Sequence, residues 1–571
     1  MSLETKSQDL KNIVANYNTQ WFLGNLSFLM TCISNGTAQD QLEKLSSPMR
    51  QLYFLGGLLM SSNPTDENKF QYSDEEWSSI IDLLNEIEVE YFSIFFPKEP
   101  EEITEQWKKA RMVAMPSFLS YFNLGPLNYE EQTIRWVQEL YEQLDDIIES
   151  ETGLKTDDYI QFYENIDKLH QTNFQSHSQG NIPLRKDWDK YSQLKIGTVE
   201  GVPDEIKKLG EERRPLYTFV ADYGIICRFF AEELVSENLS IEKVKKLLQL
   251  LSTERTQSDF LYYTATKPGN PLYENPIINI GDEMYQVFEI KQVIHAIDNF
   301  LETTCSKNTK NTSKLVDRKG KLLENRIIEL FELFFKKNYE KYVGYYVDGC
   351  EQDILFLWKD YAFIIEAKGY NLHEPFRDPD KAFVRIKNDF NSCIGYAYKQ
   401  TKRVEDKFIN KEPLKITDKN GNLIKEIDTA KYENNDFSII VNLKSFGQIQ
   451  TDLSFLLQVK DGDAYPWAVR FDDLEVFILT LIAQKKTPIF FINYLLMRED
   501  LHGKLFCSDE TEICGGFISN KINDKLIEKN EMIATHHSLA NIFDEQYKKG
   551  LGFKNEKNIK EKRSGKTMFW G

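Results

Sequence analysis

Two apolar runs joined by a short polar turn constrain the fold of this chain more than any other feature. The first run is Asp353–Trp358 and the second is Tyr361–Ala367, with Lys359 and Asp360 between them. Both runs are rich in aromatic and branched aliphatic residues, which favour strands. Apolar residues fill both alternating sets of positions, so we expect a β-hairpin that is buried on both faces.

Charged side chains gather at the open end of this predicted hairpin. Residues two apart share a face of a strand, so Glu366 and Lys368 project together while Ala367 points away. Pairing that is symmetric about the turn puts Asp353 opposite Glu366. Two carboxylates this close repel each other unless a cation joins them, and oxygen ligands alone favour Mg²⁺ or Mn²⁺. A neighbouring lysine can orient or activate a water for attack on a phosphodiester.

Regular elements are predicted on both sides of the hairpin. A helix is expected over Lys319–Asn338 and a strand over Tyr342–Val347, before the hairpin. A long helix over Asp380–Phe408 and a strand over Phe437–Leu443 follow it. The first helix carries Glu324 on an apolar stripe, which is an unusual place for a carboxylate unless it faces a site.

This segment resembles the PD-(D/E)xK, or restriction-endonuclease-like, nuclease superfamily. Asp353, then twelve residues, then Glu366-Ala-Lys368 match its motif, with Gln352 in place of the motif's proline. The resemblance implies an α-β-β-β-α-β core, and hence an α+β or α/β fold that follows a mostly helical N-terminal region. Residues 315–480 are also similar to nuclease-related-domain (NERD-like) bacterial proteins.

The resemblance further implies a Mg²⁺- or Mn²⁺-dependent endonuclease, a hydrolase that leaves a 5′-phosphate and a 3′-hydroxyl. Lys368 is expected to position the attacking water and to stabilise charge at the phosphate. The metal is expected to be held by four residues: Asp353, Glu366, Glu324 and, through its carbonyl, Ala367. DNA is the expected substrate, and bacterial anti-phage defence or restriction is the expected role by analogy.

Substrate contacts are expected on the helix after the motif. Gln400 and Tyr396 lie there, although members of the superfamily often have the glutamine before the tyrosine. Basic residues on or near this helix are candidates for contacts with the phosphate backbone: Lys387, Lys399, Lys402 and Arg403. A solvent-exposed helix face is an equally good interpretation of these basic residues.

Two other functions stay open. A scaffold protein would use Asp353, Glu366 and Lys368 as a buried salt-bridge cluster in an inactive domain and would regulate a partner. An RNA nuclease is the second alternative, because the motif reads only phosphate and metal. A second triplet, Glu289-Ile-Lys291, also ends a predicted strand but lacks an acid on the preceding paired strand.

The chain is predicted to divide into four parts. Residues 1–301 are expected to form a mostly helical region for regulation, partner binding or target sensing, with a hairpin near 276–288. The stretch 302–312 has almost no apolar content and is predicted to be a linker. Residues 313–500 are expected to form the nuclease domain, and 501–571 a C-terminal extension with a basic tail.

Charge and composition limit the partners. A net charge of −19 argues against coating nucleic acid with the whole surface. Residues 311–410 hold 18 Lys and Arg against 16 Asp and Glu, a net charge of +2, so an anionic backbone is repelled least there. The polar N-terminus, the lack of a run of about 20 apolar residues and the scattered cysteines predict a cytoplasmic protein without membrane contact. The sequence has no nucleotide-binding motif, so a separate NTPase or helicase partner is compatible with it, as is a homo-oligomer.

Overall fold

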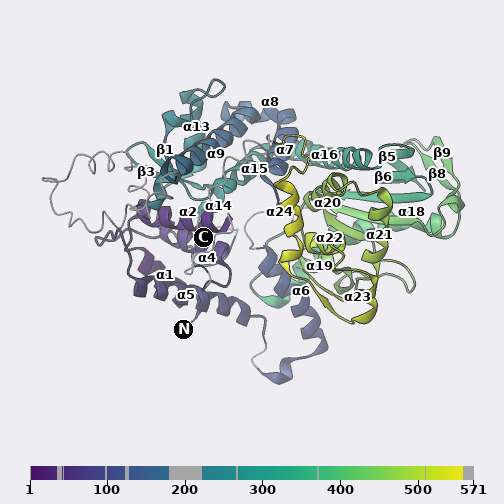
Figure 1. Cartoon of the computed structure of the whole chain (residues 1–571), viewed down its shortest axis with the longest axis horizontal. Coiled ribbons are helices and arrows are strands. Elements are labelled where there is room, and N and C mark those ends of the chain that lie inside the picture. Colours follow the sequence, from purple (N-terminus) through teal and green to yellow (C-terminus); the bar gives the residue numbers. More distant parts are fainter. Residues whose placement is uncertain are drawn as a thin grey trace. The chain divides into compact units, whose positions relative to one another are not determined.

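The chain forms two compact units whose segments alternate along the sequence. Met1–Ser93 and Thr133–Lys307 make up the first unit, and Ile94–Gln132 and Asn308–Ile559 make up the second. Both contain helices and strands, so the fold class is α+β (Figure 1). The computed structural model describes residues 2–34, 42, 44–96, 99–121, 128–178, 222–264, 268–369, 372–507 and 509–556.

The first unit is mostly helical, as predicted, and also holds a four-stranded sheet of order β1-β4-β3-β2. The predicted hairpin near 276–288 is confirmed, since β3 (Ile277–Gly281) pairs antiparallel with β4 (Met284–Val287). The triplet expected at the end of a strand begins a helix instead, because Glu289 is the N-cap of α15. The main helices and the outer strands of this unit are α1 (Leu3–Val14), α2 (Thr19–Ser34), α4 (Pro48–Met60), α5 (Asp74–Ser93), α8 (Asp145–Thr152), α9 (Thr156–Ser178), α13 (Ile241–Leu251), α15 (Ile290–Cys305), β1 (Arg228–Phe230) and β2 (Ser252–Thr253).

The predicted linker at 302–312 is the junction of two helices. Helix α15 ends at Cys305, and α16 (Thr309–Phe335) begins just beyond Asn308. The Asn308 side chain caps α16 by accepting a hydrogen bond from the Asn311 N–H at 3.0 Å. Asparagine, serine and threonine are favoured at helix ends because they satisfy exposed peptide groups, and here this polar composition marks helix termini.

The second unit is built on a mixed seven-stranded sheet of order β11-β10-β7-β6-β5-β8-β9. Three antiparallel strands follow α16, and β10 and β11 then add parallel to β7. The β8–β9 hairpin forms the opposite edge. The strands are β5 (Tyr339–Val347), β6 (Cys350–Trp358), β7 (Tyr361–Lys368), β8 (Leu414–Thr417), β9 (Leu423–Ile427), β10 (Asp436–Asn442) and β11 (Trp467–Arg470).

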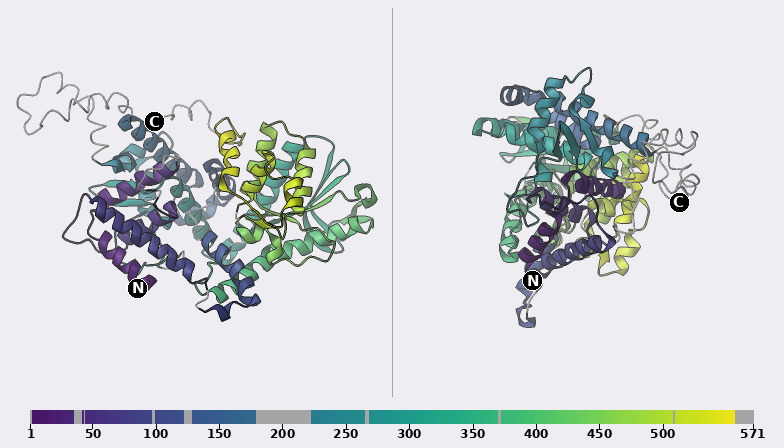
Figure 2. Two further views of the ribbon diagram at one scale, coloured as in Figure 1. Left: turned by 60° about the horizontal axis from the view of Figure 1, so that its bottom comes forward. Right: turned by 90° about the vertical axis from the view of Figure 1, so that its left-hand side faces the viewer.

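Helices cover both faces of this sheet (Figure 2). Helices α16, α20 (Phe471–Ala483) and α21 (Pro488–Glu499) share one core with alternate strand residues such as Phe356 and Phe363. On the other face, Val404 and Phe408 of α18 (Tyr396–Ile409) pack with Leu355 and Ile364. The long helix predicted at 380–408 is α17 (Pro379–Phe390) followed by α18, with a π-helical turn at Asn391–Gly395 between them.

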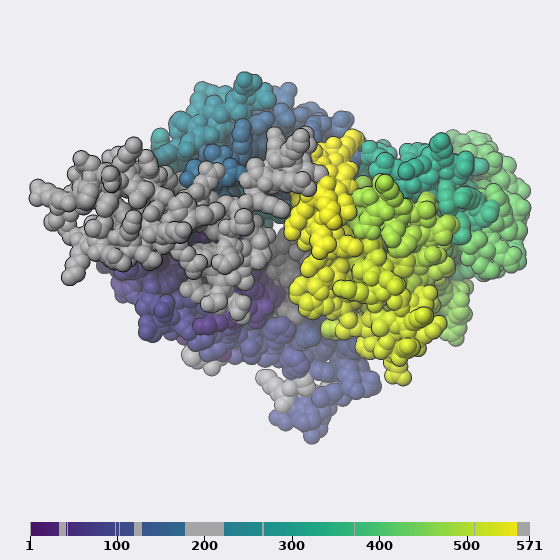
Figure 3. Space-filling view, viewed as in Figure 1, coloured from purple at the N-terminus to yellow at the C-terminus, as the bar shows by residue number. Residues whose placement is uncertain are grey.

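The second unit extends beyond the predicted 313–500 in both directions along the sequence. Helix α6 (Glu105–Tyr121) belongs to it, and Arg111 forms an ion pair of 2.9 Å with Asp380 in α17. After α21, helices α22 (Glu510–Ile518), α23 (Asp524–Lys529) and α24 (Asn541–Tyr547) contribute to the same core as α20. Figure 3 shows their yellow residues as one surface with the lime-green residues that precede them.

The stretch 172–187 is rich in Gln, Ser and Asn, a composition that predicts a loop. It is helical as far as Ser178, the end of α9, and its remainder lies outside the described residues. The basic tail after residue 556 also lies outside them. In the part of the chain that the structure describes, no helix is both long and apolar enough to cross a membrane.

Candidate active site

The β6–β7 hairpin has the register that symmetry about its turn predicts. Ile354 pairs with Ile365 and Leu355 with Ile364, so Asp353 comes opposite Glu366. Lys359, the first residue of the turn, has a positive φ of 55°, which a two-residue hairpin turn requires of one or both central residues. The turn therefore fixes which side chains meet at the open end of the hairpin.

Asp353, Glu366 and Lys368 form one hydrogen-bonded cluster. The Asp353 N–H donates to Glu366 Oε1 at 3.2 Å, and the Ala367 N–H donates to Asp353 Oδ2 at 2.8 Å. Lys368 Nζ lies 2.7 Å from Glu366 Oε2 and 3.3 Å from Asp353 Oδ2. The exposed fraction is 1% for the Glu366 side chain and 18% for that of Asp353, so only Asp353 and Lys368 reach the surface.

A glycine on the neighbouring strand interrupts the regular strand pairing beside this cluster. In the β5–β6 ladder, Val343 pairs with Ile354 and Tyr345 with Gln352, which leaves Gly344 opposite Asp353. Gly344 has a φ of 57°, in the left-handed region where a Cβ is unfavourable. The regular pairing is interrupted at the residue that faces Asp353, and a Cβ at Gly344 would meet no other atom within 4 Å.

Burial and like charge both act on Glu366. Burial, and next the charge of Asp353, raise the pKa of Glu366 to about 8, although the Lys368 ammonium opposes the shift. For Lys368, burial alone would lower the pKa, but the charges of Glu366 and Asp353 outweigh it and leave the pKa raised. Lys368 therefore keeps its positive charge at neutral pH, whereas Glu366 ionises fully only when further positive charge approaches.

Glu324, predicted from the apolar stripe of its helix, lies near the same cluster. It is half-buried on α16. Burial, and next the charge of Asp353, raise its pKa to about 7, while Lys368 opposes the shift. The charges of Asp353 and Lys368 thus act on both Glu324 and Glu366, which is the kind of charge crowding found at functional sites.

The donors present suit a hard divalent cation. Among the described residues, no three His, Cys, Asp or Glu side chains form a metal-binding group. Asp353 and Glu366 are two carboxylates on adjacent strands, and Mg²⁺ commonly binds proteins through one or two carboxylates and completes its shell with waters and phosphates. Burial, and next the charge of Asp353, raise the pKa of Glu366, and a bound dication would favour the ionised form of this carboxyl. The Ala367 carbonyl and Glu324 remain predicted ligands.

The predicted substrate residues are spread along the helices that follow β7. Gln400 donates from Nε2 to the Glu351 carbonyl at 3.5 Å, and its Oε1 is buried without a hydrogen-bond partner among the described residues. Lys387 and Lys399 are exposed and Arg403 is half-buried. Lys402 is a poor phosphate ligand, because it forms ion pairs of 2.9–3.4 Å with three acidic residues: Glu405, Asp406 and Asp463.

Two tyrosines lie at the site: Tyr396, expected from the sequence on the helix after the motif, and Tyr345, to which the sequence gave no role. The Tyr345 hydroxyl is buried and has no hydrogen-bond partner in the described part of the chain. Burial, and next the charges of Glu366 and Asp353, raise its pKa far above the ordinary value. Tyr396 is 57% exposed, and Lys368 Nζ lies 5.9 Å from its ring centroid. Local hydrophobic patterning does not predict the positive φ of Gly344, which interrupts the strand next to Tyr345.

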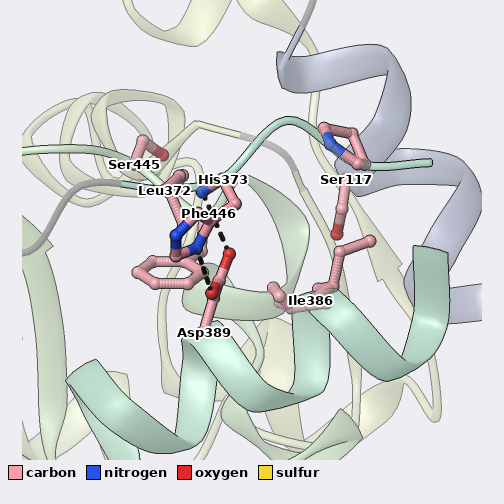
Figure 4. A pocket seen from close by; sticks show the side chains of 9 residues that line it. Ser117, Leu372, His373, Ile386, Asp389, Ser445 and Phe446 are labelled. Atoms are coloured by element: carbon pink, nitrogen blue, oxygen red, sulfur yellow. Dashed lines mark hydrogen bonds and ion pairs between the residues drawn. The ribbon is translucent and has the colours of Figure 1, made fainter. Parts of the chain in front are cut away.

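A small pocket of about 30 Å³ opens beside the loop that follows β7 (Figure 4). His373 of that loop is bound to Asp389 of α17, with 2.8 Å between Nδ1 and Oδ1. Ser117 of α6 and Ile386 of α17 form another part of the lining. The loop after β10 supplies Ser445 and Phe446. In the sequence, His373 follows Lys368 closely, which makes it a candidate for a substrate contact, with a solvated loop residue as the other interpretation. Its buried partner Asp389 lies sixteen residues further along the chain, and no local pattern predicts the pair.

Comparison with known proteins finds no relative, so the interpretation of the site rests on its geometry. No protein-family model matches the chain, and neither a curated protein nor a solved structure matches it. Membership of the PD-(D/E)xK superfamily thus stays a prediction.

Proposed function

We propose that the second unit is a metal-dependent nuclease of the PD-(D/E)xK type, with a restriction-endonuclease-like core made of α16, β5–β7, α17, α18 and β10. One observation carries the proposal. The acid of one strand and the Glu-x-Lys of the next meet in a single hydrogen-bonded cluster of two carboxyl groups and one lysine, in which Glu366 is buried and Asp353 and Lys368 reach the surface. Asp353 and Glu366 would hold Mg²⁺ or Mn²⁺, with Glu324 and the Ala367 carbonyl completing or orienting the set. A bound dication would neutralise these acids and act as a Lewis acid on the phosphodiester.

The chain's own residues set up the reaction. The Ala367 N–H holds Asp353 Oδ2, so this carboxylate is oriented before any ligand arrives. Lys368 keeps its charge at neutral pH and is placed to stabilise charge that develops at the scissile phosphate. Glu324, with a pKa of about 7, can exchange a proton with a nearby water at neutral pH. DNA is the proposed substrate, with a role in bacterial anti-phage defence or restriction.

A cleavage assay with matched variants tests the proposal. The full chain is incubated with supercoiled plasmid, linear duplex, single-stranded DNA and RNA, each with Mg²⁺, Mn²⁺ or EDTA. Asp353→Asn is expected to abolish cleavage, whereas Asp360→Asn, an exposed aspartate in the turn of the same hairpin, leaves it unchanged. Cleavage of RNA alone would replace DNA by RNA as the substrate. Cleavage that persists in EDTA or in Asp353→Asn would sink the proposal.

A catalytically silent scaffold is the second candidate, because Lys368 already forms ion pairs with both carboxylates. A buried charge cluster of this kind tends to cost stability unless its groups are fully paired. A scaffold would gain no thermal stability from Mn²⁺ or Mg²⁺. If no substrate is cleaved under any condition and neither metal changes the melting curve, the scaffold is favoured over the nuclease.

A further inference from the structure

A second polar group lies at the same sheet edge as the acidic cluster. Strands β7 and β10 run parallel with Lys368 beside Asn442, so the loops that follow them start from one edge. The first loop brings His373 to the pocket and the second brings Ser445 and Phe446 (Figure 4). Ligands of sheets with parallel strands bind outside the carboxyl ends of those strands.

Asp389 holds His373 at two points. Its Oδ2 accepts the His373 backbone N–H at 3.0 Å, and its Oδ1 lies 2.8 Å from ring Nδ1. The exposed fraction of the side chain is 7% for Asp389 and 57% for His373. A buried carboxylate that grips both the backbone and the ring of an exposed histidine sets the direction in which the ring presents Nε2.

Both loops at this edge are braced. Arg385 donates to the Glu374 carbonyl at 2.8 Å, and its guanidinium lies 4.3 Å from the Phe376 ring centroid, so the loop after β7 is fastened to α17. Asn442 and Gln450 exchange amide hydrogen bonds of 3.1 and 2.9 Å, which shape the loop after β10. The setting of His373 is therefore formed in advance, as a binding residue requires.

We propose that His373, positioned by Asp389, binds a backbone phosphate of a nucleic-acid strand close to the phosphodiester that is cleaved. The inference rests on the proposed nuclease function and adds a substrate contact to it. Five residues of chain span at most about 18 Å, and a DNA strand rises about 3.4 Å per nucleotide. The contact therefore falls within roughly five nucleotides of Lys368.

The chemistry of the pair fixes the charge of the bound ring. An ionised carboxylate and a phosphate oxygen both only accept hydrogen bonds. A ring that bridges Asp389 and a phosphate therefore carries a proton on each nitrogen and brings one positive charge to the strand. Ser117 Oγ, which is buried with no hydrogen-bond partner in the described part of the chain, is a further donor in the pocket lining.

Salt-dependent binding in EDTA tests this contact apart from cleavage. Anisotropy of a labelled single strand and a labelled duplex is measured with the full chain at pH about 6, below the ordinary histidine pKa. We compare the wild type with His373→Gln, Asp389→Asn and the control His536→Gln, which changes an exposed histidine elsewhere in the same unit. Circular dichroism and melting curves verify that each variant is folded.

Loss of one phosphate contact has a defined signature. His373→Gln is expected to weaken binding roughly tenfold and to reduce the slope of log K against log salt by about 0.7 on single strands or 0.9 on duplex. Asp389→Asn should follow it, and His536→Gln should match the wild type. An unchanged slope in His373→Gln, or a wild type that binds neither strand, would overturn this inference. The nuclease proposal would still be decided separately by the Asp353→Asn cleavage assay.

Discussion

Two triplets in this chain read Glu-x-Lys, and one ends a strand whereas the other begins a helix. Glu366 and Lys368 lie on one face of β7 and form an ion pair of 2.7 Å. Glu289, by contrast, turns to the backbone of α15 and accepts hydrogen bonds from the N–H groups of Lys291 at 3.1 Å and Gln292 at 2.8 Å. Residues two apart do not face each other on a helix, so the second pair forms no cluster.

The two triplets also differ in whether an acidic residue lies across from them. Asp353 lies across from Glu366 and adds a second carboxylate to the cluster. Near the other triplet, Asp282 sits in the β3–β4 turn with a φ of 53° and supplies no such partner. The same Glu-x-Lys pattern thus gives a charge-crowded cluster in one unit and a helix cap in the other.

The largest expected difference is in catalysis. Lys368→Ala should lower the rate of metal-dependent cleavage about 10³-fold, because it removes the charge that stabilises the transition state. Lys291→Ala, the matching change in the other triplet, should leave the rate unchanged. Initial rates on the best substrate measure both. A large loss of cleavage rate in Lys291→Ala would show that the two triplets do not differ in this way.

The second largest difference between the two triplets is expected in metal binding. Mn²⁺ at about 100 times its dissociation constant should stabilise the wild type by about 2.7 kcal/mol. Glu289→Gln should keep this gain and Asp353→Asn should lose it, because only the strand cluster gathers carboxylates. Differential scanning calorimetry with and without EDTA reads the shift. Equal gains in all three proteins would mean that Mn²⁺ binds elsewhere.

The pH dependence of stability should differ as well. The pKa of Glu366, about 8, lies above the ordinary 4.5, so the folded protein retains a proton that the unfolded chain loses. Its stabilising contribution is complete below pH about 4.5 and disappears as the pH rises through about 8. Glu366→Gln should therefore gain roughly 4 kcal/mol on the wild type between pH about 5 and 8.5 in urea unfolding. A constant difference across this range would contradict the shift.

The smallest effect is expected at the helix cap. Glu289→Ala removes the acceptor for two backbone N–H groups of α15 and for the Tyr53 hydroxyl. The first unit should lose about 1 kcal/mol of stability, with cleavage unaffected. Chemical denaturation followed by circular dichroism measures this loss. A cleavage defect in Glu289→Ala would assign this residue a role beyond its cap.

Much of the candidate site was predictable because its determinants are local. The two-residue turn at 359–360 sets the register, and strand periodicity then places Glu366 and Lys368 on one face opposite Asp353. Glu324 was also predictable from local sequence, because a carboxylate on the apolar stripe of a helix is unusual unless it faces a site. The strands and helices flanking the hairpin followed from their apolar patterns.

The rest depends on contacts that join distant parts of the chain. Gln132 donates to Glu475 at 2.9 Å across 343 residues, and no local pattern signals that residues 94–132 belong to the second unit. Asp389 and His373 are sixteen residues apart on different elements, so their pairing appears only in the fold. The boundary predicted at 302–312 agrees with the change of unit between Lys307 and Asn308. The stretch itself is the end of α15 and the start of α16 and not a linker, because helix caps and linkers share the same polar composition.

The alternation of the two units along the sequence has a consequence for synthesis on the ribosome. Residues 94–132 of the second unit emerge before residues 133–307, which complete the described part of the first. At roughly 5–20 residues per second, α6 waits about 10–35 seconds before translation reaches Asn308 and the remainder of its own unit begins to emerge. Asp353, Glu366 and Lys368 are made later still, so nascent chains pass through a long stage in which the cluster of these three residues does not exist.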